Sequence, residues 1–398
     1  MATRDTIAVE GALMPPFFAK IPISIERGEG VWVWDEEGVK YLDLTAGWGV
    51  TSIGHAHPVI QAALATQGGR LLQGPNAGLT YSPERAALLA ILAELLPVGL
   101  TRVFFTNSGA EANDAAIKLA RKVTGRRALV ATEGSFHGRT ISAVSATGQA
   151  SHRDKFDPLV PDCRFVAYDD LAALGAALEG DVAAVIVEPV QGEGGVRIPD
   201  AGYLEGVSRL CRANGSLLIV DEVQTGFCRT GPMFATAATS ARPDFLTMAK
   251  GIAGGFPLGA FAVTEDVASR LEAGDHGGTY CGNPLACAVA AAVIGHLVDN
   301  DVAARVAELG RSALDEMSSW VAAYPGVVTA ARGAGLLLLV EFCDDDTAAR
   351  VDGECLARHL FVRRTQGNAI RVFPALTITQ DELAEGLATL RAAIASVS

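Results

Sequence analysis

The sequence predicts an α/β protein with a large domain built on a mostly parallel sheet and a smaller α+β domain formed by both chain ends. The length of 398 residues favours two domains. Between residues 102 and 263, short apolar segments of strand character alternate with helical segments, which is typical of a parallel sheet covered on both faces. The chain ends show hairpin and mixed helix–strand patterns instead. We therefore expect residues 1–55 and 291–398 to form the small domain and residues 56–290 the large one.

The composition argues against several classes of protein. A net charge of −13 disfavours a general binder of nucleic acid or of anionic membrane surfaces. No apolar run approaches the length that spans a membrane, and the first residues contain no apolar signal core. The seven cysteines form no CxxC pair, which favours reduced thiols in the cytoplasm. We expect no metal site.

The sequence of residues 31–83 predicts a hairpin and the starts of two helices. Residues 31–44 alternate in polarity on both sides of a charged turn that contains glycine. A glycine-rich loop with Trp48 follows at residues 45–50. Pro58 and Pro83 then each stand where the first turn of a helix accepts proline.

The alternating region and the tail predict the remaining elements. The candidate strands of the large sheet are residues 103–106, 128–132, 164–168, 183–188, 217–221, 245–248 and 260–263. The candidate helices are residues 110–123, 171–178, 201–213, 286–298 and 303–323. Strands near residues 336–341 and 370–372 follow, and Thr379 with Glu382 predicts a capping box at the start of a closing helix.

The strand expected at residues 217–221 ends on Asp221, which is the residue around which we organise the site. An apolar run that ends in charge and then glycine is typical of a buried parallel strand that stops at a functional edge. Ligands of open α/β sheets bind at the carboxyl ends of the strands. A carboxylate placed there needs a cation or hydrogen-bond donors as partners.

Four other strand ends carry residues suited to chemistry. Ser108 and its neighbours begin a helix, where free backbone N–H groups bind phosphate, although many such turns only cap a helix. Phe136 is suited to stacking on a flat ligand and Arg139 to holding a carboxylate, but a core phenylalanine and a surface arginine are equally reasonable. Glu193 lies in a glycine-rich loop, either as a solvated charge or as one that moves. Lys250 follows an apolar strand, where a desolvated lysine has a lowered pKa and forms Schiff bases.

These strand ends together suit pyridoxal 5′-phosphate (PLP). Asp221 needs a cation, Lys250 an aldehyde, the Ser108 turn a phosphate and Phe136 a flat ring, and PLP supplies all of them. NAD fits less well, because no GxGxxG follows the early strands and a dinucleotide has no need of Lys250.

The motifs, in their order along the chain, resemble those of the class III PLP-dependent aminotransferases, and most closely the acetylornithine and ornithine aminotransferases. The resemblance runs from about residue 31 to the last helix. The stretches that carry it are residues 108–113, 136–140, 187–189, 191–195, 221–226, 229–231, 250, 254–257, 278–280 and 282–286.

This resemblance implies a fold-type-I transferase that works as a homodimer with active sites shared between subunits. It implies that Lys250 forms the Schiff base with PLP and moves the proton, and that Asp221 pairs with the pyridine nitrogen. Val223 would cover the ring opposite Phe136, and Gln224 would approach the ring hydroxyl. The predicted cofactor-binding residues are Ser108, Gly109, Ala110, Phe136, His137, Asp221, Val223, Gln224, Lys250 and, from the other subunit, Thr279.

The resemblance also implies how substrates bind. Arg139 would hold the α-carboxylate of the donor or the distal carboxylate of glutamate, and Arg371 the α-carboxylate of glutamate or 2-oxoglutarate. Glu193 would mask Arg371 while the donor is bound and swing away for glutamate. Trp48 would face the substrate, where relatives have tyrosine or an aliphatic residue. Cys228, Cys281 and the stretch 76–81 also differ from the usual pattern of the subgroup.

The predicted activity is that of an ω-aminotransferase of amino-acid metabolism. It would move the terminal amine of an N-acylated diamino acid, with N2-acetylornithine of arginine biosynthesis as the first choice, to 2-oxoglutarate. Transamination of GABA, ornithine, putrescine or aminoadipate semialdehyde and a semialdehyde aminomutase are the alternatives within the family. A non-catalytic PLP-binding regulator is the alternative of a different class.

Overall fold

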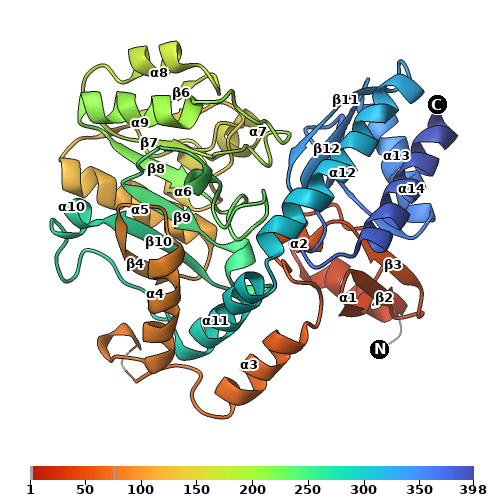
Figure 1. The fold of residues 1–398 in the computed structure, drawn as a ribbon, viewed down its shortest axis with the longest axis horizontal. Coiled ribbons are helices and arrows are strands. Elements are labelled where there is room, and N and C mark those ends of the chain that lie inside the picture. Colours follow the sequence, from red (N-terminus) through yellow and green to blue (C-terminus); the bar gives the residue numbers. More distant parts are fainter. Residues whose placement is uncertain (1–2, 76) are drawn as a thin grey trace.

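The computed structural model describes residues 3–75 and 77–398, and a seven-stranded sheet lies within the larger part of the molecule (Figure 1). The order of the strands is β4-β10-β9-β8-β7-β5-β6, and only β10 runs against its neighbours. The prediction of a mostly parallel sheet is thus confirmed. The strands are β4 (Leu100–Thr106), β5 (Ala128–Thr132), β6 (Cys163–Val166), β7 (Val182–Val187), β8 (Leu217–Asp221), β9 (Phe245–Met248) and β10 (Gly259–Thr264).

Helices cover both faces of this sheet because successive side chains of each strand point to opposite sides. Leu129 and Ala131 of β5 pack in a cluster with α5 (Gly109–Thr124), whereas Ala128 and Val130 pack with α8 (Leu171–Ala177) and α9 (Tyr203–Asn214). The short helices α6 (Ile141–Ser145), α7 (Ala150–Arg153) and α10 (Glu265–Ala268) lie in the connections. Every residue of β7 and β8 is buried, as expected for central strands.

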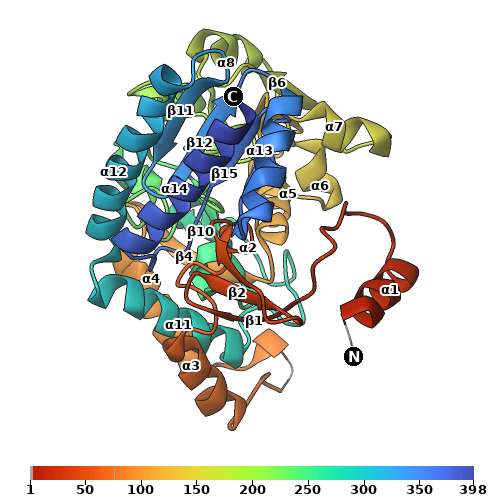
Figure 2. The same ribbon diagram turned by 90° about the vertical axis from the view of Figure 1, so that its right-hand side faces the viewer.

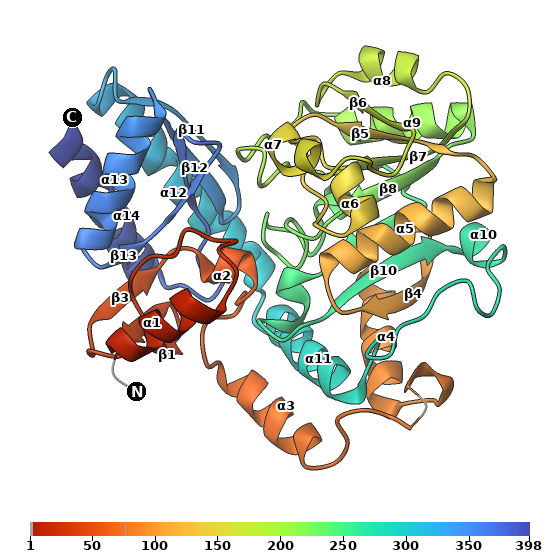
Figure 3. The same ribbon diagram turned by 180° about the vertical axis from the view of Figure 1, so that it is seen from behind.

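Both chain ends build the smaller part of the molecule. Leu42 of β3 pairs in parallel with Leu360 of β13, and Figures 1 and 3 show the N-terminal strands beside the C-terminal elements. One sheet has the order β1-β2-β3-β13 and contains β1 (Ile25–Glu29), β2 (Trp32–Asp35), β3 (Lys40–Asp43) and β13 (Leu360–Phe361). The other has the order β11-β12-β15-β14 and contains β11 (Val328–Ala334), β12 (Leu337–Phe342), β14 (Arg363–Thr365) and β15 (Ala369–Val372).

Several of the remaining helices begin where the sequence places capping residues. His57, Ser82 and Asn283 each accept a backbone N–H bond at the starts of α3 (Pro58–Gly68), α4 (Pro83–Leu95) and α11 (Pro284–Asp299). The predicted capping box of Thr379 and Glu382 is present at α14 (Gln380–Val397). The others are α1 (Thr3–Leu13), α2 (Ala46–Gly49), α12 (Val302–Ala323) and α13 (Asp345–Ala357).

Several elements were not predicted. β1, β11, β14 and α13 contain charged or glycine residues, so neither their length nor their polarity pattern separates them from loops. α1 has an exposed surface and extends away from the rest of the molecule (Figure 2). The loop expected at residues 45–50 contains a short helical turn in which Gly47 and Trp48 have positive φ.

The proposed division at residues 55/56 and 290/291 stays a prediction, and α11 continues through residue 290. Asn76, in the stretch whose sequence differs from the family pattern, lies outside the described residues. Within residues 3–75 and 77–398, no single helix has the length and apolar character of a membrane span; α11 and α12 do so only as a pair bent by 66°.

Candidate active site

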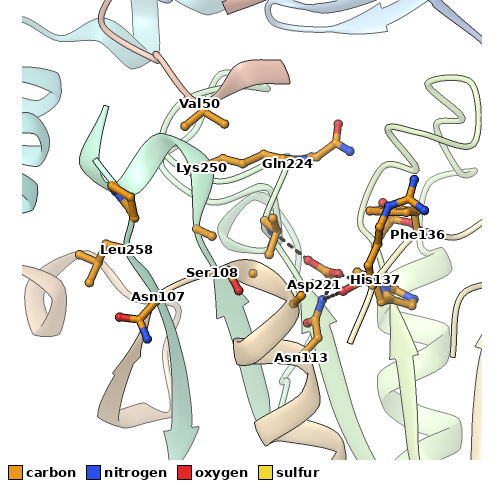
Figure 4. Close-up of a pocket in the computed structure, with 18 of the residues that line it drawn as sticks. Val50, Asn107, Ser108, Asn113, Phe136, His137, Asp221, Gln224, Lys250 and Leu258 are labelled. Atoms are coloured by element: carbon orange, nitrogen blue, oxygen red, sulfur yellow. Dashed lines mark hydrogen bonds and ion pairs between the residues drawn. The ribbon is translucent and has the colours of Figure 1, made fainter. Parts of the chain in front are cut away.

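A cavity of about 360 Å³ lies at the carboxyl ends of the central strands, where the sequence predicts the site. Side chains that follow β4, β5, β8 and β9 converge on it (Figure 4). The predicted residues in its wall are Ser108, Gly109, Ala110, Phe136, His137, Arg139, Asp221, Val223, Gln224 and Lys250. Parallel strands bring these residues together because their carboxyl ends meet at one edge of the sheet.

Asp221 is 3% exposed and is held by three hydrogen-bond donors. Its Oδ2 accepts bonds from Asn113 Nδ2 at 2.7 Å and from His137 Nδ1 at 2.8 Å, while Oδ1 accepts from Val223 N at 3.0 Å. Thr247 Oγ1 in turn donates to Asn113 Oδ1 at 2.6 Å and so orients the amide. The carboxylate therefore has one orientation at the cavity, suited to a cationic partner.

Asn113 is a functional residue that the sequence reasoning did not single out. It lies one turn after Gly109 on α5, so the same helix presents backbone N–H groups to the cavity at its start and an amide to Asp221. The helical spacing from residue 109 to residue 113 is the signal that was available for finding it.

Lys250 begins the short 3-10 helix (Lys250–Ala253) just after β9, and β9 pairs in parallel with β8 so that Thr247 lies opposite Asp221. Burial lowers the pKa of its ammonium from the ordinary 10.5 to about 8. The backbone of Lys250 has φ of 47°, a conformation that costs a non-glycine residue energy and is concentrated at functional sites. Lys250 thus combines a lowered pKa with an enforced direction into the cavity.

The start of α5 forms the end of the cavity suited to an anion. Ser108 caps the helix by accepting the Glu111 N–H at 3.2 Å, which leaves the first N–H groups of the helix directed outward. A Cβ on Gly109 would lie 2.8 Å from the methyl groups of Val223. Gly109 is therefore needed for Val223 to pack at this place beside the helix start.

Phe136 and Arg139 come from the turn after β5. The Phe136 N–H donates to the buried carboxyl of Glu188 at 3.1 Å, and burial and then Asp221 raise the pKa of Glu188 well above its ordinary value. The guanidinium carbon of Arg139 lies 5.7 Å from the centre of the Phe136 ring. Arg139 is exposed, and among the described residues it forms no ion pair, so it is available to a carboxylate.

Glu193 and Arg371 form an ion pair beside the cavity. Arg371, which is 1% exposed, donates through Nη1 to Glu193 Oε1 at 2.9 Å and to Gln224 Oε1 at 3.3 Å. Burial acts to raise the pKa of Glu193, but the charges of Arg371 and Lys250 leave it below the ordinary value. The pair is therefore ionised, and Gln224 joins it to the cavity wall by donating to Glu193 at 3.2 Å.

The loop that carries Glu193 is held by residues that the sequence reasoning missed. Thr365 Oγ1 donates to the Glu193 carbonyl at 3.2 Å, and Gln366 Nε2 donates to the same oxygen at 2.7 Å. Thr365 is the last residue of β14, and Gln366 begins the connection to β15. No local signal marks them, because the contact spans more than 170 residues along the chain.

Besides Glu193 and Arg371, which lie beside the cavity, Trp48 and Thr279 also do not line its wall. Trp48 is 43% exposed and contacts Phe18, with ring centres 6.2 Å apart, and the Arg363 guanidinium, 5.3 Å from its ring. Thr279 is exposed and lies with Cys281 in a second hollow. Their roles toward the substrate and toward the other subunit stay predictions.

The residues present fit PLP by their own chemistry. Asp221 is a buried carboxylate that needs a cation, Lys250 is an amine with a lowered pKa, and the start of α5 is an anion site. His137 Nε2 is buried and has no hydrogen-bond partner among the described residues, which marks an incomplete polar wall. A flat, phosphorylated aldehyde with a ring nitrogen matches all of these features.

Comparison with known proteins gives one consistent result. A family model described as "Aminotransferase class-III" matches residues 15–394. An acetylornithine aminotransferase of Methanopyrus kandleri is 44% identical over 377 residues, covering 95% of each chain.

Solved structures agree with these sequence matches. The ornithine aminotransferase of Toxoplasma gondii has a TM-score of 0.94 and 34% identity, covering 100% of this chain and 96% of its own. The acetylornithine aminotransferase of Elizabethkingia anophelis has a TM-score of 0.87 and 31% identity, covering 100% of both chains.

Proposed function

Since the chain belongs to the class III aminotransferases and is a PLP-dependent enzyme, we propose that it moves the terminal amine of N2-acetylornithine to 2-oxoglutarate. The products are the corresponding semialdehyde and glutamate. The observation that carries the proposal is the ionised pair of Glu193 and Arg371 beside the cavity that Arg139 lines. Arg139 has no ion-pair partner among the described residues. The names of the related acetylornithine aminotransferases support the choice of donor.

The pair of Glu193 and Arg371 answers a problem of charge. The reacting end of the donor is an amine without a carboxylate beside it, whereas glutamate presents a carboxylate at the same place. With the donor bound, Glu193 neutralises Arg371, and Arg139 holds the donor's α-carboxylate through two parallel hydrogen bonds. With glutamate or 2-oxoglutarate bound, Glu193 withdraws and Arg371 holds the α-carboxylate. One site thereby accepts two substrates of different charge.

PLP, when bound, supplies an aldehyde that exchanges amines and a ring that withdraws electrons from the substrate carbon. Asp221 holds the proton on the ring nitrogen, and His137 and Asn113 keep its carboxylate in place. Because its pKa is near 8, Lys250 is partly neutral at neutral pH and serves as the base that moves the proton at the substrate carbon. Val223 and Phe136 would enclose the ring, and the start of α5 would hold the phosphate.

The remaining parts of the proposal concern assembly and setting. We infer a homodimer in which Thr279 of one subunit completes the phosphate site of the other. The enzyme would act in the cytoplasm, in arginine biosynthesis.

Ornithine is the second candidate donor, because the Toxoplasma gondii ornithine aminotransferase has a TM-score of 0.94 to this chain. Ornithine carries a free α-amine in place of the acetylated one, so the two donors differ in charge near Arg139. GABA and putrescine differ more from N2-acetylornithine, since they lack an α-carboxylate beside an acylated amine. Aminoadipate semialdehyde differs because it presents another reacting group.

A panel of donors with 2-oxoglutarate, read as the rate of glutamate formation, tests the proposal. We expect kcat/KM for N2-acetylornithine to exceed that for ornithine, GABA and putrescine by about tenfold or more, the discrimination that a few specific contacts provide. A preference for ornithine, GABA or putrescine would overturn the donor and leave the cofactor assignment intact. An absence of amine transfer from every donor would favour a non-catalytic PLP-binding protein.

A further inference from the structure

A second buried arginine, Arg229, lies behind the substrate-binding Arg371. Arg229 follows the turn after β8 and is 3% exposed. Its Nη1 donates to the backbone carbonyls of Leu336 at 3.0 Å and Pro374 at 2.7 Å, so it joins the turn to the residues that precede β12 and follow β15. Its Nη2 is buried without a hydrogen-bond partner among the described residues.

The two guanidinium groups share one aromatic ring. The guanidinium carbon of Arg229 lies 4.3 Å from the centre of the Phe373 ring, and that of Arg371 lies 5.0 Å from it. The separation of the two charges is at most the sum of these distances, which is below the screening length of about 10 Å at 0.1 M salt. Because both groups are buried, solvent screens them even less.

The charges around this ring do not balance. Arg371 pairs with Glu193, but within residues 3–75 and 77–398 Arg229 has no ion-pair partner. Burial and then the charge of Arg371 lower the pKa of Arg229 to about 9, which still leaves it a cation at neutral pH. Two buried cations therefore lie against one ring, and only one of them is paired with a carboxylate.

Hydrogen bonding alone does not explain an arginine at this position. Its two carbonyl contacts need only two N–H donors, and the neutral amide of glutamine carries two. Burying a cation without a carboxylate partner costs free energy. We therefore expect the charge of Arg229 to have a function.

We propose that Arg229 is a specificity-determining residue for the dicarboxylate substrates, because its charge adds to that of Arg371 and draws a second carboxylate into the site. This inference rests on the proposed function in taking the acceptor to be a dicarboxylate. While Glu193 is paired with Arg371, the net charge of Arg229, Arg371 and Glu193 is +1. When Glu193 withdraws, the two arginines carry a charge of +2, and the substrate carboxylate reduces it. Arg229 itself touches no substrate and acts through Arg371.

Equilibrium binding of glutarate to the PLP-loaded enzyme, measured by calorimetry at pH 6.5, tests the proposal without turnover. Glutarate has both carboxylates of the acceptor and no group that reacts. Arg229→Gln keeps two donors and removes the charge, so we expect the dissociation constant to rise on the order of tenfold. Arg229→Lys replaces one cation by another at pH 6.5, which lies well below the ordinary lysine pKa of about 10.4, and should stay within about threefold of the wild type.

Arg305→Gln is the matched control. Arg305 also donates to two backbone carbonyls of the segment after β15, those of Thr377 and Ile378, but it lies over no ring shared with Arg371. It should leave glutarate affinity unchanged. In the activity assay, Arg229→Gln should raise KM for 2-oxoglutarate by a similar factor and change KM for the amino donor less than twofold.

Three results would overturn the proposal. The first is a wild type that does not bind glutarate, the second is an equal loss of glutarate affinity in Arg229→Gln and Arg305→Gln, and the third is an Arg229→Lys enzyme that loses as much glutarate affinity as Arg229→Gln. If Arg229→Gln fails to fold, Arg229→Lys still decides, since a purely geometric role predicts that it loses affinity. A failure of the proposed function can be distinguished from a failure of this inference. The first would be seen when the wild type is tested with the panel of donors, whereas the measurements of glutarate binding use no donor.

Discussion

At the scale of single residues, Lys250 links a strained backbone to a lowered pKa. The burial that lowers this pKa from 10.5 to about 8 makes the amine mostly neutral above pH 8 and mostly charged below it. Only the neutral amine attacks an aldehyde. We therefore expect the rate at which the cofactor-free protein captures PLP, followed by absorbance after rapid mixing, to rise with pH and to have its midpoint near 8.

Two variants control this prediction. Lys250→Ala should form no borohydride-reducible adduct with PLP at any pH, because the attacking amine is gone. Lys122→Ala removes a lysine that pairs with Asp275 at the surface, and it should leave both the rate and the midpoint unchanged. A capture rate independent of pH between 6.5 and 9, or an adduct that survives in Lys250→Ala, would contradict this role of Lys250.

At the scale of elements, the capping box of α14 holds the C-terminal helix at a defined start. Thr379 Oγ1 accepts the Glu382 N–H at 3.2 Å, and Glu382 Oε2 accepts the Thr379 N–H at 2.9 Å. Thr379→Ala should lower the free energy of unfolding by about 1 kcal/mol, the usual loss for an N-cap. Urea unfolding of the PLP-loaded enzyme measures this change.

A matched variant isolates the effect of the cap. Thr389 lies in the same helix, is partly buried, and bonds only to the Glu385 carbonyl one turn before. Thr389→Ala should change the free energy of unfolding by less than about 0.5 kcal/mol. Equal losses in the two variants would mean that the threonine cap contributes nothing beyond side-chain replacement.

At the scale of the whole molecule, the position of Thr279 away from the cavity of its own chain leads to a prediction about hybrid dimers. Suppose that Thr279 serves the partner subunit. A hybrid of one Lys250→Ala chain and one Thr279→Ala chain then has one complete site, with both Lys250 and Thr279, and one site with neither. PLP affinity of that complete site should equal the wild type, whereas the Thr279→Ala homodimer should bind PLP about tenfold more weakly, as for loss of one hydrogen bond to a charged group.

The hybrid requires differently tagged chains that are refolded together and separated, with PLP binding measured by titration. Each homodimer, taken through the same procedure, is the control. A hybrid whose single lysine-containing site binds PLP as weakly as the Thr279→Ala homodimer would place Thr279 in its own subunit's site. Sedimentation of the wild type as a monomer at assay concentration would contradict the dimer itself.

Much of the fold could be predicted because its signals are local. β5, β8 and β9 begin and end at the predicted residues, since apolar runs bounded by charge and glycine mark buried strands. The starts of α3, α4 and α14 follow from proline and capping residues. The elements that were missed, such as β11 with its half-buried pattern, are stabilised by their neighbours rather than by their own sequence.

The candidate site divides in the same way. Asp221, Lys250 and Ser108 could be placed at the cavity because each lies at or within two residues of the end of a recognisable strand. Glu188, Asn113 and Arg229 could not be assigned a role, because what matters about them is a partner on another element: the Phe136 N–H, the Asp221 carboxylate and the Phe373 ring. Periodicity identifies an element, but it does not say which side chains of two distant elements meet.

The sequence by itself determined that this chain carries a carboxylate and a lysine at neighbouring strand ends, and hence which cofactor and which kind of reaction to expect. Only the tertiary structure decided how the charges at the substrate site are arranged. Glu193 and Arg371 are 178 residues apart and meet at 2.9 Å, and Arg229 reaches the same ring as Arg371 from another element. The physical reason is that strand ends and caps depend on short-range backbone bonding, whereas buried charges acquire their partners only when distant elements pack.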